Sequence, residues 1–241
     1  EKVNSFAMML GKNYPQENIN KNWENILLNQ FHDILPGTAI KEAYDVTDEE
    51  YKSILKKGNE MLNEGIDYVA KNINLSKKSL VVFNTLGFDR DDIVEFKIPE
   101  GIKNPAILIS KKSLEIPCQL IGNNKAIFFA KNIPANGYKA FNVIESTKAN
   151  TESVSIDNTF AENKFFNIKF NNEGHITSIF DKKNNREVLK SGELANVIQA
   201  FEDKPMDYDN WDIEIYYDEK MWMVNDVQNM KVIESGSVRS T

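Results

Sequence analysis

A histidine and an aspartate stand side by side at positions 32 and 33, within the segment NWENILLNQFHDILPGTAI of residues 22–40. An imidazole is a common zinc ligand, and a carboxylate accepts hydrogen bonds from sugar hydroxyls. A zinc site needs three or four ligands. The only other histidine, His175, has no spacing to His32 that indicates a shared site. The residues alone therefore indicate only one part of a metal or substrate site.

The sequence around this pair predicts an amphipathic helix that continues to Pro36-Gly37. Its apolar residues recur at spacings of three and four, which is the pattern of one helical face; they are Trp23, Ile26, Leu27, Phe31, Ile34 and Leu35. At 100° per residue, Leu27 lies near the centre of this face, which we expect to be core. His32 falls toward the opposite side and Asp33 also leaves the stripe. Both are therefore expected outside the core.

Two interpretations of the pair remain open on this pattern. In the first, His32 and Asp33 lie on a solvated face, where a histidine near a helix C-terminus meets the helix dipole favourably. In the second, a neighbouring domain completes a site, with His32 as metal ligand and Asp33 as hydrogen-bond acceptor. The pattern by itself favours the first, because single histidines on polar helix faces are common.

The elements that must position the pair change type along the chain. Helical signals fill residues 1–75: a partial helix around Phe6, the helix described above, and a long helix that Thr38 could cap and whose apolar phase continues to Val69. From Ser79 the pattern alternates in short β segments separated by turn residues; the segments are SLVVFNTLGFD, DIVEFKIP, AILIS, KAIFFAKNIP and GYKAFNVI. A polar linker is predicted at residues 148–156. After it, KFFNIKF and HITSIF flank a hairpin turn at residues 171–174.

This order predicts an α+β multidomain fragment, with a three-helix bundle followed by β-sandwich domains. We expect the bundle at residues 1–75, a small β-sandwich at 76–146, and the N-terminal part of a large β-sandwich at 150–241. The sequence starts with Glu1 inside a helical pattern and ends on a β-like pattern. We therefore expect a piece of a longer protein.

Composition excludes several classes of function. The net charge of −7 disfavours a nucleic-acid surface, which needs clustered Lys and Arg. No apolar run approaches the roughly 20 residues that cross a bilayer. The single cysteine, Cys118, excludes an internal disulfide and a Cys-rich zinc site, and it favours a reducing compartment. The excess of Lys, Asn and Ile is typical of an AT-rich bacterial genome, so a bacterial cytoplasmic location is expected, with assembly into a homo-oligomer left open.

NQFHDILPGTAI resembles the signature of the middle domain of α-mannosidases of glycoside hydrolase family 38, in the bacterial and cytosolic-type branch. ENKFFNIKFNNEGHITSIFDKKNNREVL (residues 162–189) and FEDKPMDYDNWDIEIYY (residues 201–217) resemble the start of that family's C-terminal β region. The usual family segment Asp-Ala-Trp-Asp stands here as Asp209-Asn-Trp-Asp212. It is either a structural turn between β layers or a rim of the substrate cleft.

The resemblance implies a zinc-dependent, retaining α-mannosidase that hydrolyses terminal α-mannosides of oligosaccharides or N-glycans. His32 takes the position of one zinc ligand and Asp33 that of a residue that binds mannose hydroxyls. The other three ligands, one of them the nucleophile, belong to an N-terminal catalytic domain that this sequence lacks. The resemblance thus implies zinc as cofactor and that domain as partner. It assigns no catalytic residue to this chain, which is expected to be inactive alone.

The alternative is a non-catalytic carbohydrate-binding or scaffold β-module. Trp211 and Trp222 could then stack on sugar faces, although aromatic residues in β-sandwiches more often fill cores. Glycan binding without zinc would favour this alternative, and zinc-dependent cleavage by the whole protein would favour the enzyme.

Overall fold

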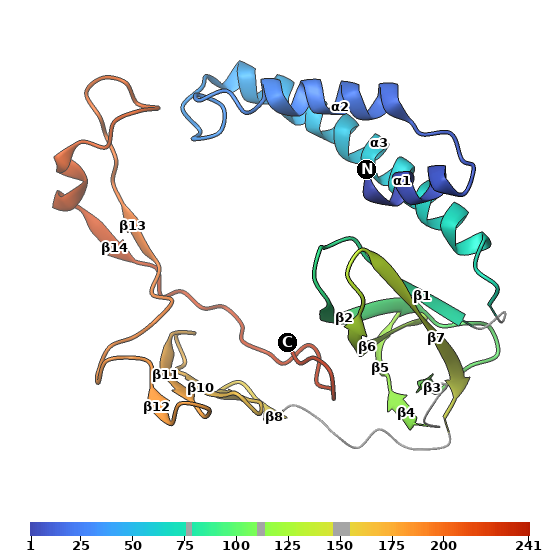
Figure 1. Ribbon diagram of the computed structural model, residues 1–241. Coiled ribbons are helices and arrows are strands. Elements are labelled where there is room, and N and C mark those ends of the chain that lie inside the picture. Colours follow the sequence, from blue (N-terminus) through green and yellow to red (C-terminus); the bar gives the residue numbers. More distant parts are fainter. Residues whose placement is uncertain (76–78, 110–113, 147–154) are drawn as a thin grey trace. The chain divides into compact units, whose positions relative to one another are not determined.

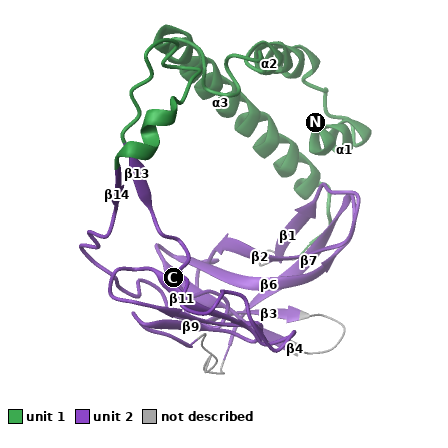
Figure 2. Cartoon of the chain, turned by 90° about the vertical axis from the view of Figure 1, so that its left-hand side faces the viewer, with its two compact units in different colours: residues 1–75, 202–220 green, residues 76–201, 221–241 purple. Residues whose placement is uncertain are grey.

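The structure is a computed structural model that describes residues 1–75, 79–109, 114–146 and 155–241. The chain is α+β and forms two compact units, which Figure 2 distinguishes by colour. The helical unit consists of Glu1–Leu75 with Glu202–Lys220, and the β unit consists of Ser76–Phe201 with Met221–Thr241. Within the described ranges, no helix combines the length and the apolarity that crossing a membrane requires.

Three helices make up most of the helical unit: α1 (Lys2–Met9), α2 (Gln16–Leu28) and α3 (Lys41–Lys71) (Figure 1). Both α1 and α2 pack against α3. The prediction of one long third helix is confirmed, since α3 is continuous over 31 residues. Thr38 does not cap it. The N-cap is Ile40, which has no side-chain cap hydrogen bond.

Gly65 of α3 is buried where α1 packs against this helix. A Cβ atom at this position would lie 3.1 Å from both Asn4 and Val3. Asn4 is buried itself, and its amide donates to the carbonyl oxygen of Met61 at 3.1 Å. A residue without a side chain therefore allows α1 to approach the α3 backbone.

The contact between α2 and α3 uses a different face of α2 from the one predicted. Ile19 and Asn22 are buried, and the amide of Asn22 donates to the carbonyl oxygen of Ile54. Most of the predicted core stripe is exposed instead, with Leu27 at 60% and Phe31 at 54%, while Ile26 and Ile34 are half-buried. The prediction was wrong because a helical wheel identifies the apolar face but not the surface that this face meets.

The β unit begins with two antiparallel sheets. One has the order β1-β7-β3-β4 and the other β2-β6-β5. The strands are β1 (Ser79–Asn84), β2 (Arg90–Lys97), β3 (Pro105–Ile109), β4 (Leu114–Pro117), β5 (Gln119–Gly122), β6 (Lys125–Ile133) and β7 (Gly137–Glu145). The alternating patterns predicted all of these except β4 and β5. Those two are short and separated by Cys118 alone, where the chain passes from one sheet to the other.

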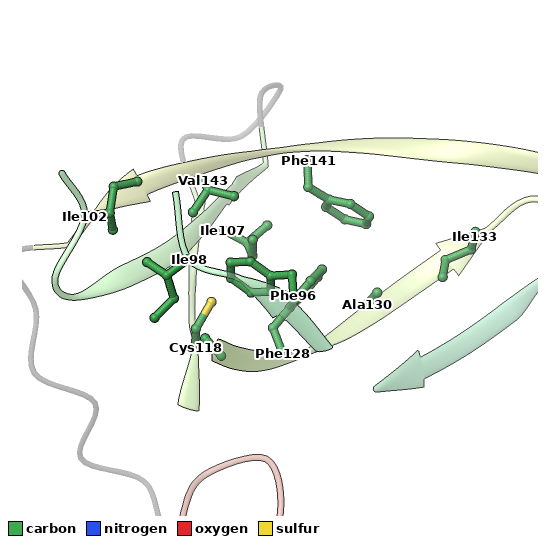
Figure 3. Close-up of a cluster of buried hydrophobic side chains, with 11 residues drawn as sticks. Phe96, Ile98, Ile102, Ile107, Cys118, Phe128, Ala130, Ile133, Phe141 and Val143 are labelled. Carbon is green, nitrogen blue, oxygen red and sulfur yellow. The ribbon is translucent and has the colours of Figure 1, made fainter. Parts of the chain in front are cut away.

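Both of these sheets contribute to one hydrophobic core (Figure 3). Phe128 is fully buried, and its ring meets Phe96 and Phe141 edge-on at centroid distances of 5.9 and 5.2 Å. Cys118 lies in the same cluster. Burial raises the pKa of its thiol to about 12, because the thiolate would lose its hydration. The cysteine is therefore a core residue with an unreactive thiol.

A five-stranded antiparallel sheet follows, in the order β12-β11-β10-β9-β8. Its strands are β8 (Ser155–Ile156), β9 (Phe160–Glu162), β10 (Phe166–Phe170), β11 (Ile176–Asp181) and β12 (Arg186–Glu187). The hairpin between β10 and β11 is confirmed, with Gly174 donating its N–H to the carbonyl oxygen of Asn171. Of the predicted linker at 148–156, only Ser155 and Ile156 lie within the described residues, and they form β8.

A two-stranded sheet pairs β13 (Gln199–Phe201) with β14 (Met221–Met223). The residues between these strands include the 3-10 helix η1 (Ile215–Glu219) and belong to the helical unit.

Candidate functional site

His32 and Asp33 lie in a turn and not in a helix. The helix α2 ends at Leu28, and Asn29 is its C-cap. Residues 29–40, which we call the site turn, connect this cap to α3 and contain Pro36 and Gly37. The expectation that the helix continues to Pro36 was therefore wrong. After Asn29 the N–H groups of Gln30 and Phe31 donate to the carbonyl oxygens of Leu27 and Leu28, three residues back, and this tighter pattern ends the α-helix.

The imidazole of His32 is accessible to a ligand. Its side chain is 73% exposed, and its Nε2 atom lies 3.7 Å from Oδ2 of Asp33, whose side chain is 33% exposed. The ring packs at a tilt against the Phe31 ring, with 4.2 Å between the centroids. As predicted, neither side chain belongs to the core. An open imidazole beside a carboxylate can supply one nitrogen to a metal ion and hydrogen-bond acceptors to a polar ligand.

The backbone of Asp33 is the point at which the site turn is fixed. Its carbonyl oxygen accepts hydrogen bonds from the N–H of Thr38 at 3.0 Å and from the Tyr44 hydroxyl at 3.1 Å. The Thr38 hydroxyl lies 3.3 Å from this oxygen and from Oδ1 of Asp33. The Tyr44 oxygen also accepts from the N–H of Ala39 at 3.1 Å. Thr38 and Tyr44 thus hold the residue next to His32.

The other end of the site turn is fixed by Asn29, which is 2% exposed. Its amide nitrogen donates to the carbonyl oxygen of Asn25 and to the carboxylate of Glu50, at 2.9 and 2.6 Å. Its amide oxygen accepts from the Thr47 hydroxyl at 2.7 Å. The sequence pattern did not identify Asn29, Thr47 or Tyr44, because their partners depend on how the turn returns to α3. For Asn29 the one local signal is that polar side chains recur on the face of α2 that contacts α3.

The described residues do not complete a metal site. Among residues 1–75, 79–109, 114–146 and 155–241, no three His, Cys, Asp or Glu side chains gather closely enough to hold a metal ion. His175, in the β unit, is 4% exposed, and its Nδ1 atom lies 3.5 Å from Glu173 Oε2. His32 therefore fits a zinc ion as a single ligand, and the rest of the ligand set would have to come from residues outside the described ranges.

Exposed apolar side chains lie on α2 and in the site turn. They are Trp23, Leu27, Leu28, Phe31 and Leu35. Singly exposed apolar residues are ordinary, but a contiguous stripe is typical of an interaction surface. Residues on both sides of His32 thus present a surface that another part of a protein could cover.

The segment Asp209-Asn-Trp-Asp212 forms a turn in which Trp211 and Asp212 donate their N–H groups to the carbonyl oxygen of Tyr208. It belongs to the helical unit, where the Asn210 amide donates to the carbonyl oxygen of Ala39 at 3.3 Å. Trp211 is 64% exposed and Trp222 is 47% exposed. Neither tryptophan fills a core in the described structure, contrary to the more common role of such residues.

Two family models match the chain. Residues 1–69 match "Alpha mannosidase middle domain" and residues 161–241 match "Glycosyl hydrolases family 38 C-terminal domain". Together the matches cover more than half of the chain. They include the site turn and the segment around Asp209, the regions on which the resemblance depends.

Similar proteins agree with these matches. "Alpha-mannosidase G" of Dictyostelium discoideum is 25% identical over 99% of this chain and 25% of its own length. "Alpha-mannosidase 2C1" of Mus musculus is 26% identical over 85% of this chain and 18% of its own length. The chain thus spans a quarter or less of these relatives.

Solved structures share the fold. An α-mannosidase from Enterococcus faecalis V583 superposes with a TM-score of 0.59, at 16% identity, over 85% of this chain and 31% of that one. A family 38 glycosyl hydrolase from Enterococcus faecalis gives a TM-score of 0.62, also at 16% identity, over 85% and 32%. The chain therefore belongs to glycoside hydrolase family 38, with residues 1–69 corresponding to the middle domain and residues 161–241 to the C-terminal domain.

Proposed function

We propose that this chain is the middle and C-terminal part of a zinc-dependent, retaining α-mannosidase that hydrolyses terminal α-mannosides of oligosaccharides or N-glycans. The observation that carries the proposal is the exposed imidazole of His32, in a family 38 middle domain, beside Asp33. The names of the relatives support the substrate class. We further propose that the three helices form a bundle and that residues 76–146 and 150–241 belong to β-sandwiches.

In this proposal His32 supplies one neutral nitrogen to a zinc ion whose other ligands lie on an N-terminal catalytic domain. Zinc, when bound, would grip two adjacent hydroxyls of the mannose ring. Asp33 would accept hydrogen bonds from the substrate hydroxyls. Since only a neutral imidazole coordinates a metal, zinc affinity should fall when His32 becomes protonated. The exposed stripe around Leu27 and Phe31 supports a covering domain on this side.

Retaining hydrolysis needs two carboxyl groups, one as nucleophile and one as general acid. We assign neither to this chain. The expected result is that the 241-residue chain alone does not hydrolyse an aryl α-mannoside, whereas the full-length protein does.

The central test replaces the ligand in the full-length protein. We expect His32→Ala to remove bound zinc and to lower turnover of an aryl α-mannoside by at least about 100-fold, since even outer-shell partners of a metal ligand contribute 10- to 100-fold. Metal analysis of the purified protein measures zinc per chain, and kinetics measure turnover. His175→Gln is the control, because it removes the other histidine and should retain zinc. A His32→Ala protein with the full zinc content would refute the assignment.

A second candidate is a carbohydrate-binding module, which the exposure of Trp211 and Trp222 favours. Aromatic side chains that are exposed can stack on apolar sugar faces. Binding of mannose oligosaccharides by the 241-residue chain in the presence of a chelator, lost on Trp211→Ala, would support it. Absence of binding to the chain would leave the enzyme as the explanation.

A further inference from the structure

The two proposed site residues lie in an irregular segment of the helical unit. The site turn contains no continuous helix, and Gly37 has a φ of +91°. A turn of this kind would lose conformational freedom when a metal or a sugar binds to it, and affinity would fall accordingly. Something must therefore hold the turn in advance if His32 is to bind tightly.

The hydrogen bonds of the site turn converge on two points of α3. Before His32, the buried amide of Asn29 is bound by Thr47 and Glu50, from successive turns of α3. After His32, Tyr44 lies with its hydroxyl 3.1 Å from the carbonyl oxygen of Asp33 and 3.3 Å from that of Ile34.

The Tyr44 hydroxyl uses both its donor and its acceptor capacity. It donates its one hydrogen toward the Asp33 and Ile34 carbonyl oxygens, and it accepts the N–H of Ala39 at 3.1 Å. One side chain thus ties the middle of the turn to its end. Phenylalanine has nearly the same shape and lacks all of these bonds, so Tyr44→Phe tests the hydroxyl alone.

We propose that Tyr44 is a positioning residue for the metal site, and that it acts with Asn29 as a two-point clamp that fixes the backbone on both sides of His32. Tyr44 contacts neither metal nor substrate in this proposal. It lowers the ordering cost of metal binding by holding the Asp33 carbonyl. The inference rests on the proposed function, since it takes His32 as a zinc ligand.

The test is the zinc dissociation constant of the metal-free full-length protein, measured by competition with a chromogenic chelator. We expect Tyr44→Phe to weaken zinc binding about tenfold, the size of effect typical of groups that orient a metal ligand. Thermal unfolding of the same proteins shows how much stability each variant loses.

Tyr68→Phe is the matched control. Tyr68 lies on the same helix, and its hydroxyl also donates to a backbone carbonyl, that of Leu10 at 3.2 Å. It should keep the wild-type zinc affinity, because its hydroxyl lies away from the site turn. If Tyr44→Phe does not fold, Thr47→Val carries the comparison, because it removes the hydroxyl that binds Asn29.

The clamp would be overturned if Tyr44→Phe bound zinc as tightly as Tyr68→Phe. Where Thr47→Val replaces Tyr44→Phe, the same comparison applies to it. This outcome differs from failure of the proposed function, in which His32→Ala itself retains zinc. A clamp variant that binds zinc like the wild type, together with a zinc-free His32→Ala, would thus reject the positioning role alone.

Discussion

Two glycines of α3 should respond differently to the same substitution. Gly58 and Gly65 are both inside the helix, so replacement by alanine raises helix propensity at either position by about 1 kcal/mol. A Cβ at Gly58 meets nothing within 4 Å, whereas a Cβ at Gly65 lies 3.1 Å from Asn4 and Val3. The surroundings of the added Cβ therefore decide whether the substitution raises the free energy of unfolding.

At Gly65 the neighbours have little room to move. Asn4 and Val3 are buried, and Asn4 is bound to the Met61 carbonyl. Overpacking of this kind costs about 1–3 kcal/mol. The propensity gain is common to both variants, so the difference in unfolding free energy between Gly58→Ala and Gly65→Ala measures the packing cost alone. We expect Gly58→Ala to be the more stable by about 1–3 kcal/mol.

Circular dichroism at 222 nm suits this comparison, because all three α-helices of the described chain belong to the helical unit. In a unit of this size 1 kcal/mol corresponds to roughly 4–8 °C in Tm. Gly58→Ala should raise Tm, and Gly65→Ala should leave it unchanged or lower it. Equal increases in both variants would show that α1 does not approach α3 at Gly65, and the packing argument would be refuted.

Two further predictions concern the β unit. Phe128→Leu should lower the free energy of unfolding by about 1–3 kcal/mol through the loss of two edge-on aromatic contacts. Phe129 is the 41% exposed neighbour, and Phe129→Leu should change this free energy by less than about 0.5 kcal/mol. Urea unfolding, monitored through amide exchange in β6, measures both variants, and equal effects would contradict the core assignment. The Ser178 hydroxyl, with the backbone N–H groups of Ile179 and Leu189, lowers the pKa of Glu187 from its ordinary value of 4.5 to about 2. The contribution of this carboxylate to the free energy of unfolding is therefore complete above pH 4.5 and is lost as the pH falls through about 2. Titration of the Glu187 carboxyl carbon by NMR checks the lowered pKa, and a midpoint near 4.5 would contradict it.

The sequence by itself determined the features that depend on local periodicity. The unbroken apolar phase to Val69 predicted α3 as one helix, and alternation predicted β6, β7 and the hairpin between β10 and β11. The motif around His32 also led to the family, because a continuous run of matching residues carries that information without any structure. A helix or hairpin is specified largely by neighbours in the chain, so such predictions hold.

Tertiary structure decided the features that depend on distant partners. The apolar residues around Leu27 were expected to be core, yet the face with Asn22 and Asn29 meets α3, because the hydrogen bonds of those amides end on α3. His32 was expected on a helix, and it lies in a turn that Tyr44 holds from another element. A helical wheel gives the direction of a side chain but not its partner. The surroundings of His32 could therefore be known only once the chain had folded.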